Sequence, residues 1–325
     1  MPRYMLLIAY EGTGFCGWQR QEPPDALAKE QPPEPGAMPY KHTTPMIESR
    51  RDGRVALRTV QGVVERAVSD VVRHEVEVMG ASRTDSGVHA RGQVAAFTCH
   101  PLDENPTGRE SPTLLAADKP LQPGAGWPVA RGVDRLTMAI NSRLPADVLV
   151  RSAQRVRPEF DPISDVISKA YSYTFHLSRS RPLFDRATVT HIWRDSPINL
   201  DAMHAAAGLL VGEHDFASFA ATGHGRLSTV RTVHRCTVTR LPVSEATDAN
   251  AARIRIDIAG SGFLWNMVRI IAGTLLQVGL NQRTADDVRT ILLSKDRTKA
   301  GPTAGPEGLC LESITYRDGA LDEPA

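Results

Sequence analysis

The chain has 325 residues, enough for two domains of ordinary size, each with its own hydrophobic core. Its hydrophobic content of 41% and charged content of 23% are those of a soluble globular protein. The formal net charge is only +1, which excludes recognition of nucleic acid by bulk charge, so any RNA must be bound by local patches.

The first element predicted is a β-strand within MPRYMLLIAYEGTG. This stretch is too short for a secretory signal and has no small-residue cleavage site. The GTGFCG that follows, with Gly12, Gly14 and Gly17, matches the dinucleotide pattern G-x-G-x-x-G. However, Trp18 and the QRQEPP after it cannot open the helix that would hold a pyrophosphate. A nucleotide site is therefore not expected here.

Two segments, residues 22–57 and 101–133, are rich in proline and charge and have little periodicity. Both are predicted to be long, mobile surface insertions rather than core elements. Between them, apolar residues at helical spacing over residues 59–72 predict one amphipathic helix that packs on a sheet. The stretches HEVEVMG and GQVAAF then predict two strands.

Asp85 lies between these two strands, in the segment SRTDSGVHARGQVAAF. It is open to two interpretations. Asp-Ser-Gly is ordinary turn chemistry, because Asp bonds its own backbone and Gly supplies a positive φ. Alternatively, the chain holds a carboxylate at this corner for chemistry.

The second half repeats the alternation of strands and helices. YSYTFHL places Tyr171, Tyr173, Phe175 and Leu177 on one face of a strand, and ARIRIDI does the same with its three isoleucines. Helices are predicted over residues 199–212 and 263–279. Strand-then-glycine pieces occur in both halves. We therefore expect an α+β fold of two related halves facing each other, each an antiparallel sheet with helices on one side.

Two further residues have double interpretations. Arg269 lies among apolar residues in MVRII, where a stranded guanidinium costs several kcal/mol, so it needs a carboxylate partner or a water-filled cleft. It forms either a structural ion pair or a pair that keeps a functional carboxylate ionised. Tyr171 is either a core residue of its strand or, beside Lys169, an aromatic that stacks on an exposed base.

Neither a metal nor a cofactor is predicted, because the sequence has no GK[ST] step, no HExxH and no clustered histidines. Its four cysteines are scattered without a CxxC pair, which favours a reduced, cytoplasmic protein. The longest apolar stretch, residues 263–280, contains Asn266 and Arg269 and is a poor membrane span, so no membrane association is expected.

The segment GASRTDSGVHARGQVAAF resembles the signature of the TruA family of tRNA pseudouridine synthases. Other pieces agree with that family in order: YEGTGFCGWQRQ, TVQGVVERAV, NSRLPADV, KAYSY, GEHDFASFA, SGFLWNMVRIIAGTL and KDRTKAGPTAGPEGLCLESITY. They cover nearly the whole chain except the two proline-rich segments.

The resemblance implies an isomerase that converts uridine to pseudouridine in the tRNA anticodon stem-loop, at positions thirty-eight to forty. Asp85 would be the nucleophile, and Arg83 would help hold the RNA and the flipped-out uridine. Tyr171 would pack against the target base, and Arg269 would pair with Asp85. The implied fold has two α+β halves, residues 1–157 and 158–325, around a positively charged central cleft. The protein would act as a homodimer without metal or cofactor.

The sequence departs from the family where Ile163 and Ser164 replace an arginine and an aromatic residue, and where Ser86 follows the aspartate in place of a common Ala. The basic run Arg50, Arg51, Arg54 and Arg58 is either a tRNA contact or part of a solvated loop. Two other functions stay open: a non-catalytic RNA-binding relative, and a nucleoside glycosidase that cleaves without rejoining.

Overall fold

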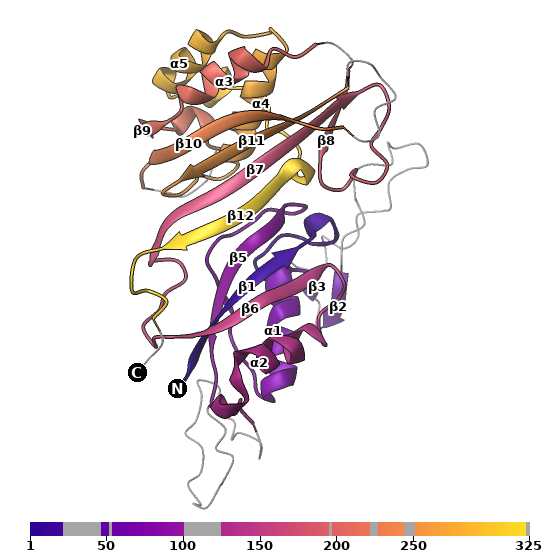
Figure 1. Cartoon of the computed structure of the whole chain (residues 1–325), viewed down its shortest axis with the longest axis vertical. Coiled ribbons are helices and arrows are strands. Elements are labelled where there is room, and N and C mark those ends of the chain that lie inside the picture. Colours follow the sequence, from indigo (N-terminus) through magenta and orange to yellow (C-terminus); the bar gives the residue numbers. More distant parts are fainter. Residues whose placement is uncertain are drawn as a thin grey trace, which may run out of the picture. The chain divides into compact units, whose positions relative to one another are not determined.

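A computed structural model describes residues 1–21, 47–51, 54–100, 125–194, 197–221, 227–243 and 251–322 (Figure 1). The chain divides into two compact units, Met1–Asp165 with Tyr316–Ala325, and Val166–Thr315. Each unit combines helices with a mostly antiparallel sheet, so the predicted α+β class is confirmed. The proline-rich parts of both predicted insertions, residues 22–46 and 101–124, lie outside the described residues.

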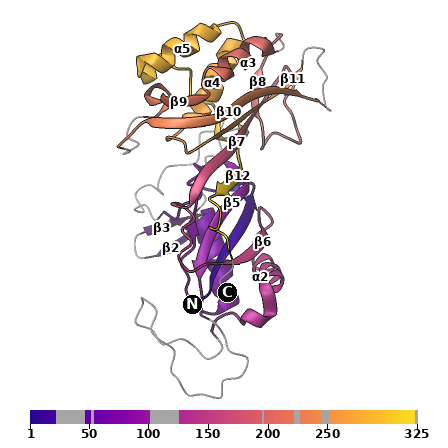
Figure 2. The same cartoon turned by 60° about the vertical axis from the view of Figure 1, so that its left-hand side comes forward.

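The first unit is built on an antiparallel sheet with the strand order β6-β1-β5-β4. The strands are β1 (Arg3–Tyr10), β4 (Met79–Gly80), β5 (His89–Thr98) and β6 (Val148–Val156), with a separate hairpin of β2 (Ile47–Arg51) and β3 (Arg54–Leu57). The helices are α1 (Val60–Val72) and α2 (Gly132–Asn141), with short 3-10 turns η1 (Gly12–Gly14) and η3 (Val129–Arg131). Helix α2 contacts both α1 and β6, and Figure 2 shows it beside β6.

Helix α1 confirms the predicted amphipathic helix. Its buried side chains are Val60, Val63, Val64, Ala67, Val68 and Val72. Thr59 caps the first turn, because its hydroxyl accepts from the backbone N–H of Gly62 at 3.3 Å. The helix ends where Arg73 adopts the left-handed conformation, with φ of 58°.

The strand predicted over residues 74–80 is wrong except for Met79–Gly80. The backbone N–H groups of Val76 and Val78 donate to Ser69 Oγ and Glu65 Oε1 of helix α1, at 3.2 and 3.1 Å. Side chains of the helix have therefore replaced the ladder bonds that a strand would make.

The end predicted for the second insertion, residues 101–133, is wrong because it lies too late in the sequence. From residue 125 onward the chain is packed in the first unit, and Trp127 is buried. Residues 125–133 thus belong to the folded unit, and they lead through η3 into α2.

The second unit is built on a sheet with the strand order β12-β7-β11-β10-β9, in which β8 pairs in parallel with β7. Its strands are β7 (Val166–Ser178), β8 (Thr190–Trp193), β9 (Gly212–Asp215), β10 (Val230–Leu241), β11 (Ala252–Gly260) and β12 (Leu309–Tyr316). Its helices are α3 (Leu200–Gly208), α4 (Met267–Gly279) and α5 (Ala285–Ser294), with 3-10 turns η4 (Ala217–Phe219), η5 (Arg297–Lys299) and η6 (Pro306–Gly308). The three helices gather on one side of β10 and β11 (Figure 1).

Strand β11 alternates as predicted, with its three isoleucines buried between half-buried polar residues. Strand β7 differs, because Ser172 and His176 on the opposite face from Tyr171 are buried as well. Strand β7 lies inside the sheet, between β11 and β12, rather than at its edge. The helix predicted from residue 263 begins only at Met267, because Asn266 before it is in the left-handed conformation.

Candidate active site

Asp85 lies in the loop of residues 81–88, which joins the antiparallel strands β4 and β5. The backbone N–H of Val88 donates to the carbonyl of Asp85 at 3.2 Å, which closes a four-residue turn. Gly87 occupies the third position of that turn with φ of 79°, a value that favours glycine. The predicted turn is confirmed, and it leaves the side chain of Asp85 half-buried rather than fully exposed.

The segment that follows β1 holds this loop from one side. The backbone N–H of Trp18 donates to the carbonyl of Thr84 at 3.0 Å, and the N–H of Gly87 donates to the carbonyl of Phe15 at 3.3 Å. The hydroxyls of Tyr10 and Thr84 are hydrogen-bonded at 2.7 Å in a buried position. Residues on both sides of Asp85 are thus fixed to another part of the chain, which limits the movement of its carboxylate.

The glycines of GTGFCG permit this close approach. A Cβ atom on Gly12 would lie 2.0 Å from the carbonyl oxygen of Val88, and one on Gly17 would lie 2.6 Å from that of Thr84. Gly17 also has φ of 94°, which side chains rarely allow. The pattern that resembles a dinucleotide fingerprint therefore serves to pack one loop against another.

Gln93, which no sequence pattern indicated, holds the start of the loop. Its side chain is fully buried within β5, where Nε2 donates to the carbonyl of Ser82 at 2.6 Å. Its Oε1 accepts from the backbone N–H groups of Ser82 and Val94, both at 3.2 Å. The signal that could have found it is a single amide in the apolar run of this strand, because a buried amide needs partners.

Arg83 is exposed on the same loop, two residues before Asp85. Arg58, which belongs to the basic run of the sequence, contacts residues of the first unit. Its guanidinium forms a double hydrogen bond with the carboxylate of Asp147, at 2.8 and 2.9 Å, and lies 4.0 Å from the ring centre of Phe15. Arg58 therefore makes structural contacts within the first unit rather than lying in a solvated loop. The side chains of the other three arginines of the run lie outside the described residues.

Tyr171 lies in β7, opposite Ile258 of β11. Its side chain is buried, and its ring meets that of Phe263 edge-on, with 5.3 Å between the ring centres and 86° between their planes. This packing fixes the plane of the tyrosine ring. Lys169 lies two residues earlier on the same strand and is half-buried.

Arg269 is the third residue of helix α4 and is half-buried, although its neighbours Val268 and Ile270 are buried. Its Nε donates to the backbone carbonyl of Ala304 at 2.7 Å, and its Nη1 donates to the side-chain oxygen of Asn266 at 2.8 Å. Two polar groups of the second unit therefore orient the guanidinium.

The four residues singled out from the sequence thus divide between the units. Arg83 and Asp85 share one loop of the first unit. Tyr171 and Arg269 belong to the second unit, on β7 and α4, two elements that contact each other.

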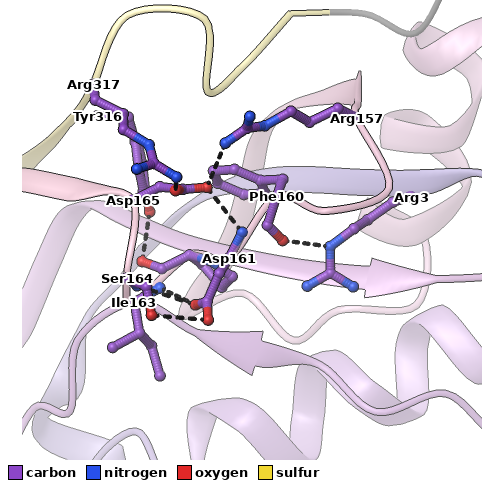
Figure 3. Close-up of polar contacts among 10 residues, drawn as sticks. Arg3, Arg157, Phe160, Asp161, Ile163, Ser164, Asp165, Tyr316 and Arg317 are labelled. Atoms are coloured by element: carbon purple, nitrogen blue, oxygen red, sulfur yellow. Dashed lines mark hydrogen bonds and ion pairs between the residues drawn. The ribbon is translucent and has the colours of Figure 1, made fainter.

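The segment in which Ile163 and Ser164 depart from the family pattern forms a compact polar turn (Figure 3). The carboxylate of Asp161 accepts from the backbone N–H groups of Ile163 and Ser164, at 2.7 and 3.1 Å. These hydrogen bonds, led by that from Ile163, hold the pKa of Asp161 below its usual range. The segment is therefore folded by its own side chains despite the departure.

Asp165, at the end of the same turn, is 2% exposed. Its carboxylate accepts from the backbone N–H of Asp161 at 3.0 Å and from Arg157 at 3.1 Å, and it pairs with Arg317 (Figure 3). These contacts, with the Asp161 N–H as the largest cause, lower the pKa of Asp165. Arg317 follows β12, so one carboxylate ties together two segments distant in sequence.

Among the described residues, no three His, Cys, Asp or Glu side chains gather closely enough to hold a metal ion. None of the helices that the structure describes has the length and apolar character needed to cross a bilayer.

Comparison with known proteins identifies the family. Residues 206–317 match the family model described as tRNA pseudouridine synthase. The chain is 36% identical over 318 residues to the tRNA pseudouridine synthase A of a Thermoanaerobacter strain, which covers 97% of this chain and all of the relative. It is 34% identical over 316 residues to that of Maridesulfovibrio salexigens, covering 97% of this chain and 91% of the relative.

A third relative, the tRNA pseudouridine synthase A of a Geobacter strain, is 32% identical over 318 residues, which cover 97% of this chain and 99% of the relative. Similarity therefore runs through both units rather than being confined to one motif. The chain belongs to the TruA family of tRNA pseudouridine synthases, and it is an isomerase that acts on tRNA.

Proposed function

We propose that the protein converts uridine to pseudouridine in the anticodon stem-loop of tRNA, at positions thirty-eight to forty, with Asp85 as the nucleophile. The reaction breaks the C1′–N1 bond, turns the uracil and forms a C1′–C5 bond, while C5 loses a proton and N1 gains one. A carboxylate suits this chemistry because it either attacks C1′ or stabilises positive charge there, as in glycoside cleavage.

The observation that carries the proposal is the way the Asp85 loop is held. Gln93 fixes Ser82 at its start, and hydrogen bonds to Thr84 and Gly87 fix the residues on either side of Asp85. Turn chemistry alone does not require so many long-range contacts at a surface corner. A catalytic carboxylate does require them, because its position must be set before the substrate arrives.

The other three residues have supporting roles in the proposal. Arg83, exposed beside Asp85, binds the RNA and the extruded uridine. Tyr171, whose ring plane is fixed by Phe263, packs against the target base. Arg269 pairs with Asp85. In this proposal the four residues act on one nucleotide within a positively charged cleft.

We also propose that the enzyme is a cytoplasmic homodimer that uses neither metal nor cofactor, because the isomerisation has no redox step. Light scattering across a range of protein concentrations tests the dimer, and a monomer at every concentration would contradict it.

The test of Asp85 uses tRNA transcripts tritiated at C5 of uridine, because isomerisation releases that hydrogen to water. The wild type should release tritium without free uracil, and Asp85→Asn, which has nearly the same shape, should release none. Ser86→Ala is the matched control. It removes only the hydroxyl that bonds the carbonyl of Phe15 at 3.1 Å and should leave turnover close to that of the wild type.

Three other outcomes would change the proposal. Free uracil would indicate a glycosidase. Full turnover by Asp85→Asn would exclude Asp85 as the nucleophile. Undiminished tritium release from transcripts with cytidine at all three proposed positions would exclude the anticodon stem-loop as the target.

A further inference from the structure

Two acceptors in the second unit hold the guanidinium of Arg269. One is the backbone carbonyl of Ala304, at 2.7 Å from Nε, and the other is the side-chain oxygen of Asn266, at 2.8 Å from Nη1. Because these bonds use nitrogens at two positions of a planar group, together they fix its direction as well as its place.

The Ala304 acceptor is anchored to helix α4 by its neighbours. The N–H of Ala304 donates to the carbonyl of Arg269 at 3.2 Å, and the N–H of Gly301 donates to the hydroxyl of Thr274 at 2.9 Å. Gly273 allows this approach, since a Cβ atom there would lie 2.0 Å from the carbonyl oxygen of Pro302. The main chain around Ala304 thus fixes the position of the carbonyl that accepts from Arg269.

Asn266 supplies the second acceptor, and its backbone conformation is unusual for a residue that precedes a helix. It is the N-cap of α4 with φ of 59° and ψ of 6°, in the left-handed region, whereas N-cap residues are ordinarily extended. An asparagine at this position commonly caps the helix with its side chain, but Asn266 makes no such bond. Its side-chain oxygen instead accepts from Arg269, the third residue of the helix.

The left-handed conformation is uncommon for residues other than glycine, and asparagine tolerates it better than most. Residues held in sparsely populated backbone conformations cluster at functional sites. In this conformation the amide oxygen of Asn266 accepts a hydrogen bond from the guanidinium of Arg269.

We propose that Asn266 is a positioning residue for the isomerisation, and that its amide oxygen sets the orientation in which Arg269 acts. The inference rests on the proposed function of Arg269. If Arg269 works on the reacting centre, a misdirected guanidinium slows the chemical step while tRNA still binds. The effect of losing the amide should therefore fall on kcat and leave KM almost unchanged.

The test needs a variant that removes the acceptor without disturbing the backbone. Asn266→Gly meets this need, because glycine adopts φ of 59° freely. Asn281→Gly is the matched control at the other end of α4. Asn281 is also left-handed, with φ of 55°, and its side-chain oxygen accepts from Asn199 at 3.3 Å. Asn266→Asp is the rescue variant, because it restores an oxygen that accepts from Arg269.

We expect Asn266→Gly to lower kcat by about 10-fold to 100-fold, with KM for tRNA within about twofold of the wild type. Its midpoint of thermal unfolding should match that of Asn281→Gly, which should keep full activity. Asn266→Asp should recover most of kcat. Wild-type kcat in Asn266→Gly, an equal loss in Asn281→Gly, or no recovery in Asn266→Asp would each overturn the inference.

Arg269→Met separates this inference from the proposal beneath it. If Arg269→Met turns over tRNA like the wild type, the proposed role of Arg269 is wrong and the inference fails with it. If Arg269→Met loses activity while Asn266→Gly retains it, Arg269 acts in the reaction and only the positioning role of Asn266 is wrong.

Discussion

At the scale of single residues, Asp165 shows how one buried carboxylate can join distant segments. Its oxygens take hydrogen bonds or charge contacts from Asp161, Arg157 and Arg317, which come from the β6–β7 connection and from the end of β12 (Figure 3). Asp165 is buried, but the side chains of Arg157 and Arg317 are 32% and 59% exposed, so water screens part of each attraction. The structural value of the carboxylate therefore comes largely from satisfying several donors at once.

We predict that Asp165→Asn lowers the free energy of unfolding by about 1–3 kcal/mol at pH 7, because the amide replaces a charged acceptor of several hydrogen bonds. The folded protein lowers the pKa of Asp165, so its ionised form contributes stability above the unfolded-state pKa of about 3.9. That stability is lost as the pH falls through the lower, folded-state pKa. The difference between wild type and variant should therefore narrow below about pH 4.

Urea unfolding at a series of pH values measures this difference. Asp318→Asn is the control, since Asp318 is an exposed carboxylate next to Arg317 in the sequence. It should leave the unfolding curve almost unchanged. A pH-independent difference between wild type and Asp165→Asn would mean that the charge of Asp165 contributes nothing to stability.

At the scale of elements, the Asp85 loop and the segment after β1 pack closely against each other. Gly17 is the clearest point of contact, because its φ of 94° and the nearness of the Thr84 carbonyl both exclude a side chain. We predict that Gly17→Ala destabilises the fold by on the order of 2 kcal/mol, from the left-handed penalty and the displacement of the loop. It should also lower kcat by about 100-fold at temperatures where the variant is still folded, because Asp85 moves with its loop.

Gly208→Ala makes the same chemical change in open space at the end of helix α3, where a Cβ atom would meet nothing within 4 Å. It should be neutral or slightly stabilising, by up to about 1 kcal/mol. Thermal unfolding and tritium release on both variants make the comparison. Equal behaviour of the two would show that the contact at Gly17 does not hold the catalytic loop.

These elements also show what the sequence could and could not predict. The turn at Asp85 was predictable because Asp, Ser and Gly determine it locally. Helix α1 was predictable from its periodicity. The residues that hold the loop were not, because their contacts join distant positions, such as Tyr10 and Thr84, which are 74 residues apart.

Local patterns failed where side chains outside the element took over its backbone. Residues 74–78 have the composition of a strand, but Ser69 and Glu65 of α1 bind their N–H groups. Helix α4 starts later than its apolar pattern predicts, because Asn266 adopts a conformation that no propensity would assign to it. Both failures came from features of the folded state, contacts in one case and a backbone conformation in the other. The periodicity of a sequence does not reveal either.

At the scale of the whole molecule, a net charge of +1 has to be reconciled with a polyanionic substrate. The 38 Lys and Arg are nearly balanced by 37 Asp and Glu, so tRNA gains little from long-range attraction. Several arginines, Arg58 and Arg157 among them, are engaged by carboxylates of the protein itself. Binding should depend on local contacts between basic side chains and phosphates, each of which releases counterions.

We therefore predict that kcat/KM falls steeply and linearly with salt on a double logarithmic plot, although the protein as a whole is nearly neutral. The slope should be steeper for full-length tRNA than for an isolated anticodon stem-loop, because more phosphates are contacted. Thermal unfolding over the same salt range is the control, and it should change little, which assigns the loss to binding. A flat salt response with full-length tRNA would rule out a large phosphate footprint. Equal slopes for the two substrates would confine that footprint to the stem-loop.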